Sequence, residues 1–313
     1  MKRLLWLLAA VVLAVTEASP PRPETTKIRI PVWLDSEPEH ALTPADFRAS
    51  VDGTQSRILA LESPKDDLVL LLVLDLSSGD LSVIDPAKQT LLDAIRKLPA
   101  KTFVGLLRDD DGLRVLQDPT PDREVIANEI SLPTLTGHPG VLSTVDTLER
   151  IGDAMLKKSA VRVAILYVTD GDVHTYREDF TNPVINSSDP HDLSRKFPEV
   201  LVQEKVAKLT AVLASQQTPL FIVDLGQRTD RLNQAYHNGL KQLAETTGGA
   251  AFFSTAITEI PAAIQKSFET VESHYSLTVS LPERVSSRIQ IRLTGPEGGK
   301  PASYRMHLTL PKR

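Results

Sequence analysis

Two long apolar segments, each ending in aspartate, most constrain how this chain can fold. Residues 68–75 read LVLLLVLD, and residues 161–170 read VRVAILYVTD. Continuous apolar runs of this kind are typical of parallel strands that are covered on both faces by helices. Because parallel strands end at one edge of their sheet, and open α/β folds bind ligands at that edge, we expect Asp75 and Asp170 to lie together there.

Helical and short apolar segments alternate along residues 66–271 around these two runs. Alternating strands and helices predict a doubly wound, mostly parallel α/β sheet with helices on both faces. Residues 109–112 (DDDG) are expected to form a turn, after which residues 113–116 pair back onto the preceding strand. The remaining predicted strands are 102–107, 219–223 and 250–253, and the predicted helices are 86–98, 121–130, 143–157, 199–214, 231–245 and 258–271.

Both ends of the chain show a different pattern, in which apolar and other residues alternate with a period of two. This period is typical of strands with one buried face, and a few such strands need a covering layer. We therefore predict that residues 28–63 and 272–313 meet in one small antiparallel β-sandwich, with the α/β domain inserted between them. The expected strands are 28–34, a hairpin over 47–61 that turns at Asp52-Gly53, and 275–281, 289–293 and 304–310.

The first residues have the composition of a secretory signal peptide. Two basic residues precede a short apolar run from Leu4 to Val15, and small residues follow it. The run is shorter than the roughly 20 residues that span a bilayer, although an uncleaved membrane anchor is the alternative. We expect residues 1–18 to be a signal peptide, residues 19–27 a Pro-rich leader, and the protein to be exported, periplasmic or secreted. The chain has no cysteine, which excludes disulfides and thiolate metal sites.

Composition and motifs argue against several classes of function. The formal net charge of −5 gives no basic surface for nucleic acid. The sequence contains no G-x-S-x-G, H-E-x-x-H, G-x-G-x-x-G or phosphate-loop motif. A binding module is therefore expected rather than an enzyme, with an unrecognised hydrolase as a remote alternative.

The segments Asp75-Leu76-Ser77-Ser78-Gly79 and Thr169-Asp170-Gly171-Asp172, each after a buried strand, resemble the von Willebrand factor type A (VWFA) domain. In that family a D-x-S-x-S motif and a later T-D-G-[DE] motif build a metal-ion-dependent adhesion site. Residues 243–253 resemble the late helix and strand of the same fold. Residues 42–53 resemble the N-terminal segment of an exported bacterial subgroup, the VWFA-related proteins.

The resemblance implies a role for each residue of the two motifs. Ser77 would bind a metal ion directly, and Asp75 and Asp170 would bind it directly or through water. The ion would be Mg²⁺, or else Ca²⁺ or Mn²⁺, and an acidic side chain of a protein partner would complete its coordination. Two expected hydroxyl ligands are missing, because Gly79 replaces the second serine, and Val141 or Leu142 stands where the family has a threonine. Ser143 or Thr144 could supply that hydroxyl only from a shifted loop.

Two interpretations of this degenerate site remain open. In one, a weakened metal site assists binding of a protein partner. In the other, Asp75, Ser77 and Asp170 only cap the following turns and helices, and the protein binds partners or acts as a scaffold without metal. In both interpretations, residues within the two motifs and just after the second would face the partner, namely Ser78, Gly79, Asp172, His174 and Tyr176.

Overall fold

The computed structural model describes residues 26–36, 38–138, 140–176, 199–296, 301 and 303–310. The predicted signal peptide and most of the predicted leader lie outside the described residues. Residues 177–198 also lie outside the described residues.

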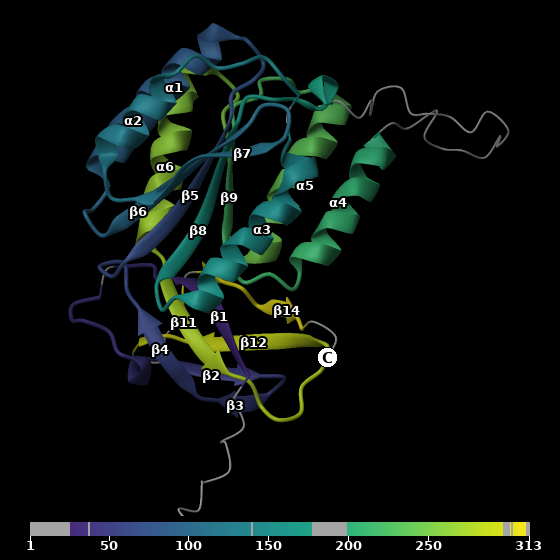
Figure 1. Ribbon diagram of the computed structural model, residues 1–313. Helices are drawn as coiled ribbons and strands as arrows, with labels where there is room; N and C mark the ends of the chain where they lie inside the picture. The colour runs from purple at the N-terminus through teal and green to yellow at the C-terminus, as the bar shows by residue number, and fades with distance from the viewer. Residues whose placement is uncertain are drawn as a thin grey trace, which may run out of the picture.

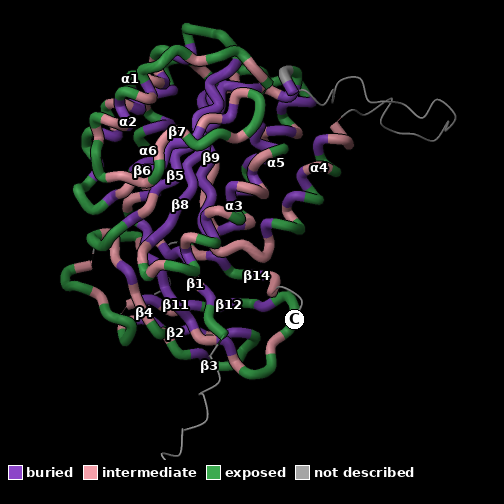
Figure 2. The backbone as a smooth tube through the Cα atoms, in the orientation of Figure 1, coloured by how far each residue is buried: buried purple, intermediate pink, exposed green. Residues whose placement is uncertain are grey.

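A six-stranded sheet forms the centre of the molecule (Figure 1). Its strand order is β10-β9-β8-β5-β6-β7, and only β7 at one edge runs antiparallel to its neighbour. The two apolar runs of the sequence lie side by side at its centre and are almost wholly buried (Figure 2). The doubly wound α/β prediction is therefore confirmed. The strands are β5 (Leu68–Asp75), β6 (Thr102–Asp109), β7 (Leu113–Thr120), β8 (Arg162–Thr169), β9 (Leu220–Asp224) and β10 (Ala251–Phe253).

Helices cover both faces of this sheet, because successive strand residues point to opposite faces and both sets are apolar. One face packs against α1 (Leu81–Lys97), α2 (Arg123–Ser131) and α6 (Ile260–Ser273). The other face packs against α3 (Val141–Lys158), α4 (Glu199–Leu213) and α5 (Arg231–Thr247).

Helix α1 begins earlier than the sequence pattern predicts. We expected its start at Pro86, but the Asp80 side chain accepts a hydrogen bond from the Ser82 N–H and caps the helix at Leu81. Pro86 therefore lies inside the first turns. The earlier start places the N-terminus of α1 directly beside the Asp75–Gly79 segment.

The two ends of the chain meet in two four-stranded antiparallel sheets beneath the α/β domain (Figure 1). Each sheet combines strands from both ends, in the orders β13-β1-β11-β4 and β14-β12-β2-β3, and their apolar residues share one core. This is the predicted sandwich. The strands are β1 (Lys27–Trp33), β2 (Arg48–Val51), β3 (Thr54–Ser56), β4 (Ile58–Glu62), β11 (Tyr275–Ser280), β12 (Arg288–Thr294), β13 (Ser303–Tyr304) and β14 (His307–Thr309).

Two details of the sandwich differ from the sequence-based expectation. The predicted hairpin over 47–61 contains only β2 and β3, because β4 crosses to the other sheet and pairs with β11. The predicted strand 304–310 is divided into β13 and β14, which belong to different sheets. Met306, between them, is 56% exposed although the alternating pattern placed it in the core.

The buried Arg162 holds the sandwich against the base of the α/β domain. Arg162, at the start of β8, donates hydrogen bonds of 2.9–3.0 Å to the carbonyl oxygens of Pro64, Asp66, Glu272 and His274. Pro64 and Asp66 lie between β4 and β5, and Glu272 and His274 lie at the end of α6 and just after it, so one side chain binds both places where the chain passes between the domains. None of the helices in the described part of the chain is long and apolar enough to cross a membrane.

Candidate functional site

Asp75 and Asp170 meet at the carboxyl end of the central sheet. Strands β5 and β8 are parallel neighbours in a register that sets Asp75 opposite Thr169. The Asp170 N–H donates to the carbonyl oxygen of Asp75 at 3.0 Å, which extends the pairing by one residue. The residues at this end, 76–81, 132–138, 140 and 169–176, are called the rim below.

The Asp75 carboxyl is wholly buried and is enclosed by donors of the protein itself. Its Oδ1 accepts from the Ser77 hydroxyl at 2.9 Å, and its Oδ2 accepts from the Thr169 hydroxyl at 2.9 Å and the Gly140 N–H at 3.3 Å. Burial, followed by repulsion from the carboxylate of Asp109, raises the pKa of Asp75 well above its ordinary value. Asp75 thus joins three separate segments at the rim.

The Asp170 carboxyl holds the first rim loop in place. Its Oδ1 accepts from the N–H groups of Ser77 and Ser78 at 3.0 and 3.1 Å, and its Oδ2 accepts from the Ser78 hydroxyl at 2.7 Å. Burial raises the pKa of Asp170, although these hydrogen bonds oppose the shift. Two backbone donors on one oxygen occupy both of its lone-pair directions.

Asp109 is a third buried carboxyl at this edge that sequence analysis missed. It was expected in a turn, but it is the last residue of β6 and has no exposed surface. Its Oδ2 accepts from the hydroxyls of Thr144 and Tyr167, both at 2.6 Å, whereas its Oδ1 has no hydrogen-bond partner in the described structure. The signal was present, because Asp109 follows an apolar strand just as Asp75 does.

Strand β9 extends the row of buried polar side chains. Its last residue, Asp224, lies opposite Thr169 in the register of β8 and β9 and is 1% exposed. His237 on α5 places its Nε2 3.1 Å from Asp224 Oδ2. Burial lowers the pKa of His237, but the interactions with Asp224 outweigh it and the net shift is upward. Neither residue was singled out from the sequence.

The residues predicted to face a partner divide into two groups. Ser78, Gly79 and His174 are exposed at the rim. Asp172 is partly covered, because it caps the short helix η2 (Val173–Thr175) and lies 2.8 Å from the Arg228 Nε.

Tyr176 is not on the surface. It is only 6% exposed, its hydroxyl accepts from the Leu142 N–H at 3.0 Å, and this hydroxyl lies 3.3 Å from that of Tyr236. Its apolar ring belongs in the core between the sheet and α5. Tyr176 therefore supports the rim from beneath, and its expected place among partner-facing residues is corrected.

The structure shows what stands at the two positions where the resembling motif has further hydroxyl ligands. Gly79 has a φ of 81°, a conformation that a serine would adopt only with strain. Val141 and Leu142, where the threonine was expected, are buried in the core, and the Thr144 hydroxyl donates to Asp109. In the described part of the chain, no group of three or more His, Cys, Asp or Glu side chains is arranged to hold a metal ion.

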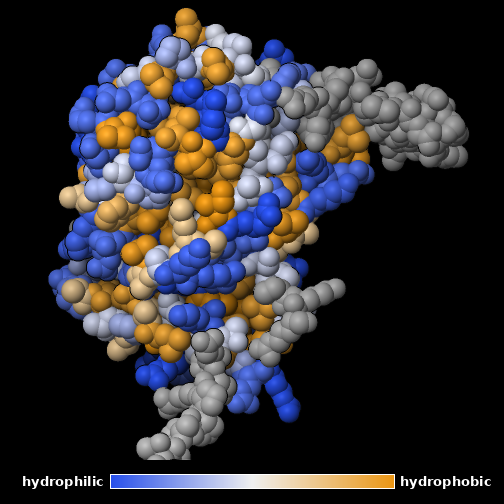
Figure 3. Space-filling view, in the orientation of Figure 1, coloured by the Kyte–Doolittle hydropathy of each residue, from blue (hydrophilic) through white to orange (hydrophobic). Residues whose placement is uncertain are grey.

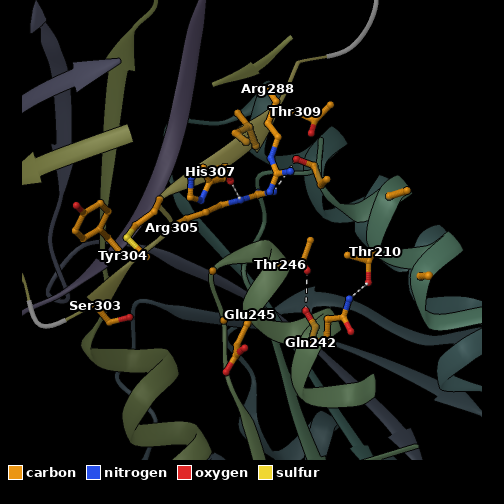
Figure 4. Close-up of a pocket in the computed structure, with 17 residues that line it drawn as sticks. Thr210, Gln242, Glu245, Thr246, Arg288, Ser303, Tyr304, Arg305, His307 and Thr309 are labelled. Carbon is orange, nitrogen blue, oxygen red and sulfur yellow. Dashed lines mark hydrogen bonds between the residues drawn. The ribbon is translucent and has the colours of Figure 1, made fainter. Parts of the chain in front are cut away.

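A cavity of about 840 Å³ lies far from the rim, between helices α4 and α5 and the strands β12–β14 (Figure 4). Arg305 runs along one wall and is 5% exposed. Its guanidinium donates to the carbonyl oxygens of Ala214, Gln216 and Leu213 at the end of α4. The cavity lies along the junction between the α/β domain and the sandwich. The guanidinium of Arg305 in its wall is already hydrogen-bonded to backbone carbonyl oxygens.

The strand order, the single antiparallel edge strand and the helices on both faces define the fold class of this protein. It has a VWFA-like α/β domain inserted into a β-sandwich.

Neither a family model nor a curated protein sequence matches the chain. Solved structures do. The von Willebrand factor type A protein from Catenulispora acidiphila is 10% identical, with 93% of this chain and 76% of that chain covered at a TM-score of 0.45. A D319A mutant of the PilB minor pilin from Streptococcus sanguinis is 12% identical at a TM-score of 0.47, with 67% of this chain and 62% of that chain covered. The chain thus spans less than two thirds of that pilin. The vWF domain of the type V pili tip protein Mfa5 from Porphyromonas gingivalis is 12% identical, covering 66% and 95%, at a TM-score of 0.43.

Proposed function

We propose that this protein is an exported binding module that holds a protein partner against the rim, and that the rim works without a resident metal ion. The observation that carries this proposal is the hydrogen bonding of the Asp170 carboxylate. Its oxygens accept three hydrogen bonds from Ser77 and Ser78, so they are already engaged with the loop that they anchor. The role of the aspartates is then to shape the rim.

The donor set supports the same conclusion. Mg²⁺ prefers octahedral oxygen coordination and is held by oxygens that are free to bind it. Here the Gly140 N–H donates to Asp75 in the region where the resembling family has a threonine hydroxyl. Asp75 is therefore met at this position by a hydrogen-bond donor and not by an oxygen atom that could bind a metal ion. Two of the three predicted ligands, Asp75 and Asp170, already accept hydrogen bonds. The Ser77 hydroxyl oxygen accepts none among the hydrogen bonds that the structure describes.

The surface of the rim suits a protein partner. Leu81, at the start of α1, is 64% exposed, and Leu135 in the next rim loop is 56% exposed. The two loops are joined, because the Gly137 N–H donates to the Ser77 carbonyl oxygen at 3.1 Å. Leu81 and Leu135 therefore lie on segments that are fixed to each other, where they offer a partner apolar contacts beside polar groups. Catalysis is not proposed, because the described Ser77 and Ser78 hydroxyls bond to carboxylates and not to a histidine base.

The test is capture of a partner in the presence of a chelator. Immobilised wild type is incubated with the secreted proteins of the source cells, with EDTA or with Mg²⁺, and captured proteins are identified. We expect the same partner in both conditions. The rim variants Ser78→Arg and Leu81→Asp should lose it, whereas Leu59→Asp, an exposed leucine on β4 in the sandwich, should retain it.

A calorimetric titration separates the two interpretations of the site directly. Mg²⁺, Ca²⁺ and Mn²⁺ are titrated into wild type and Asp75→Ala, and we expect no binding heat from either. Heat from the wild type alone, together with capture that EDTA abolishes, would instead establish the metal-assisted interpretation.

A further inference from the structure

The two sheets of the sandwich differ in what covers their outer faces. The outer face of β13-β1-β11-β4 packs against the α/β domain. There, Arg29 on β1 donates to the carbonyl oxygens of Ser159 and Val161. On the same strand, Trp33 donates from its Nε1 to the carbonyl oxygen of Thr270 at 2.8 Å. The outer face of β14-β12-β2-β3 is instead open to solvent, because the side chains of β12 that point away from the sandwich core are exposed.

Cationic and uncharged polar side chains make up this open face. The registers of β12 with β2, and of β2 with β3, place one set of side chains on it, since alternate residues of a strand share a face. No strand of this sheet contains an aspartate or a glutamate, although the whole chain has a formal net charge of −5. The set is called the arginine face below and consists of Arg48, Ser50, Gln55, Arg288, Gln290 and Arg292.

The three arginines of this face lie close enough to bind one partner together. Arg292 lies opposite Ser50, and Arg48 lies opposite Thr294, so the Cα atoms of the diagonal pair Arg48 and Arg292 are about 7–8 Å apart. Arg288 precedes Arg292 by four residues on β12, a distance of about 13 Å along a strand. Within the described residues, the structure shows no hydrogen bond or ion pair to any of the three guanidinium groups. Their N–H donors are therefore available.

The acidic residue nearest to this face in sequence is already engaged. Asp52 lies in the turn between β2 and β3. Its Oδ1 accepts from the Gln290 N–H at 2.8 Å, and its Oδ2 accepts from the N–H and the hydroxyl of Ser286 at 3.0 and 2.8 Å. Asp52 thus ties the turn to β12 and forms no ion pair with the arginines among the described contacts.

We propose that the arginine face binds an acidic segment of a protein partner. A guanidinium group can donate two parallel N–H bonds to the two oxygens of a carboxylate. In an extended segment, alternate side chains point the same way at intervals of about 7 Å, which is close to the separation of Arg48 and Arg292. Aspartates or glutamates at alternate positions of such a segment would meet the arginines without rearrangement of the sheet.

The composition of the face favours a protein partner over a membrane or a nucleic acid. Polybasic segments that bind anionic membranes carry about four to eight cations, and proteins that lie on membranes also insert apolar side chains. The arginine face has three arginines and no apolar residue. Nucleic-acid binding requires a strongly basic domain that neutralises many phosphates.

The arginine face belongs to the sandwich and lies at the opposite end of the molecule from the rim (Figure 1). Hydrophilic side chains project at this lower end, where β2 and β3 lie (Figure 3). The two proposed sites therefore do not compete for one surface, and the inference does not depend on partner binding at the rim.

The test is fluorescence anisotropy with a labelled peptide of about twelve residues, in which glutamate and serine alternate. We expect wild type to bind this peptide, more weakly as NaCl is raised, and not to bind a matched peptide with glutamine in place of glutamate. The triple variant Arg48→Gln/Arg288→Gln/Arg292→Gln should raise the dissociation constant by about tenfold or more.

A control variant removes the same number of charges elsewhere. Arg96→Gln/Lys97→Gln/Lys101→Gln changes three exposed cations at the base of the α/β domain and should bind the peptide like wild type. Circular dichroism confirms the folding of each variant. If the triple arginine variant does not fold, Arg292→Gln alone decides, and it should weaken binding by about threefold.

Three outcomes would overturn the proposal. The first is a wild type that does not bind the glutamate peptide. The second is equal affinity of wild type and the arginine variant, or an equal loss in the control variant. The third is co-sedimentation of wild type with vesicles that contain phosphatidylglycerol, if the arginine variant loses it, because the face would then bind a lipid surface.

Discussion

The backbone N–H of Asp170 donates to the carbonyl oxygen of Asp75 at 3.0 Å. This bond joins two strand ends that are 95 residues apart in sequence, counted from their positions, and it brings both carboxyls to one place. Both side chains bind Ser77, since Asp75 accepts from its hydroxyl and Asp170 from its N–H, and each also binds residues that the other does not. Asp75 contacts Thr169 and Gly140, whereas Asp170 holds Ser77 and Ser78.

Removal of the Asp170 carboxyl should release the first rim loop. In Asp170→Ala, two backbone N–H groups and the Ser78 hydroxyl lose their acceptor, and we expect a loss of about 2 kcal/mol in the free energy of unfolding. Asp170→Asn retains one acceptor oxygen and should lose less. Urea unfolding measures the stability, and faster hydrogen exchange at residues 77–80 locates the effect. Unchanged exchange in this loop would contradict the anchoring role.

Substitution of Arg162 should loosen the junction between the two domains. Its guanidinium reaches four carbonyl oxygens, which a lysine ammonium cannot span. We expect Arg162→Lys to lower the free energy of unfolding by about 3 kcal/mol. The control is Arg292→Lys, because Arg292 is exposed on β12. Equal melting temperatures for the two variants would show that Arg162 is not needed to hold the connections.

The stability of the protein should depend on the protonation of Glu149. This residue on α3 has no exposed surface and neither carboxyl oxygen has a hydrogen-bond partner in the described structure. Burial, followed by the charge of Asp153, raises the pKa of Glu149 well above its ordinary value, against an opposing effect of Arg305. A carboxyl with a raised pKa binds its proton more tightly in the folded state than in the unfolded state. Its favourable contribution is thus complete below the unfolded pKa of about 4.3 and is lost as pH rises toward the folded pKa.

Glu149→Gln removes this titration and keeps the shape of the side chain. We expect the variant to be more stable than wild type at neutral pH and to show a smaller decline in stability above about pH 4.3. Thermal unfolding across a pH series measures both. Glu204→Gln, at an exposed position of α4, is the control and should follow wild type. A Glu149→Gln curve parallel to wild type would contradict the raised pKa of Glu149.

Deletion of residues 272–313 should destabilise the whole chain. Strand β11 lies between β1 and β4, and β12 pairs with β2, so the N-terminal strands would lose their partners and expose the shared core. Calorimetry and limited proteolysis of the truncated protein should show a lower melting temperature and early cleavage within residues 27–62. Full thermal stability after truncation would count against the closed sandwich.

Sequence alone determined the elements whose pattern is local. The two apolar runs, the helical spacing between them and the period of two at both ends predicted the α/β sheet, the inserted arrangement and the meeting of Asp75 and Asp170. Periodicity reports which face of a segment is buried, because burial follows the 3.6-residue and two-residue repeats of helices and strands.

Only the tertiary structure decided what the polar residues at the strand ends do. Asp109 looked like part of a turn, and its burial beneath Gly140 depends on α3, which is remote in sequence. Tyr176 looked like a loop residue but fills the core beside Tyr236. The sequence also could not show that Ser77, Ser78 and Gly140 supply the donors for Asp75 and Asp170. Hydrogen bonds depend on distances and directions between segments far apart in the chain, and no local pattern records them.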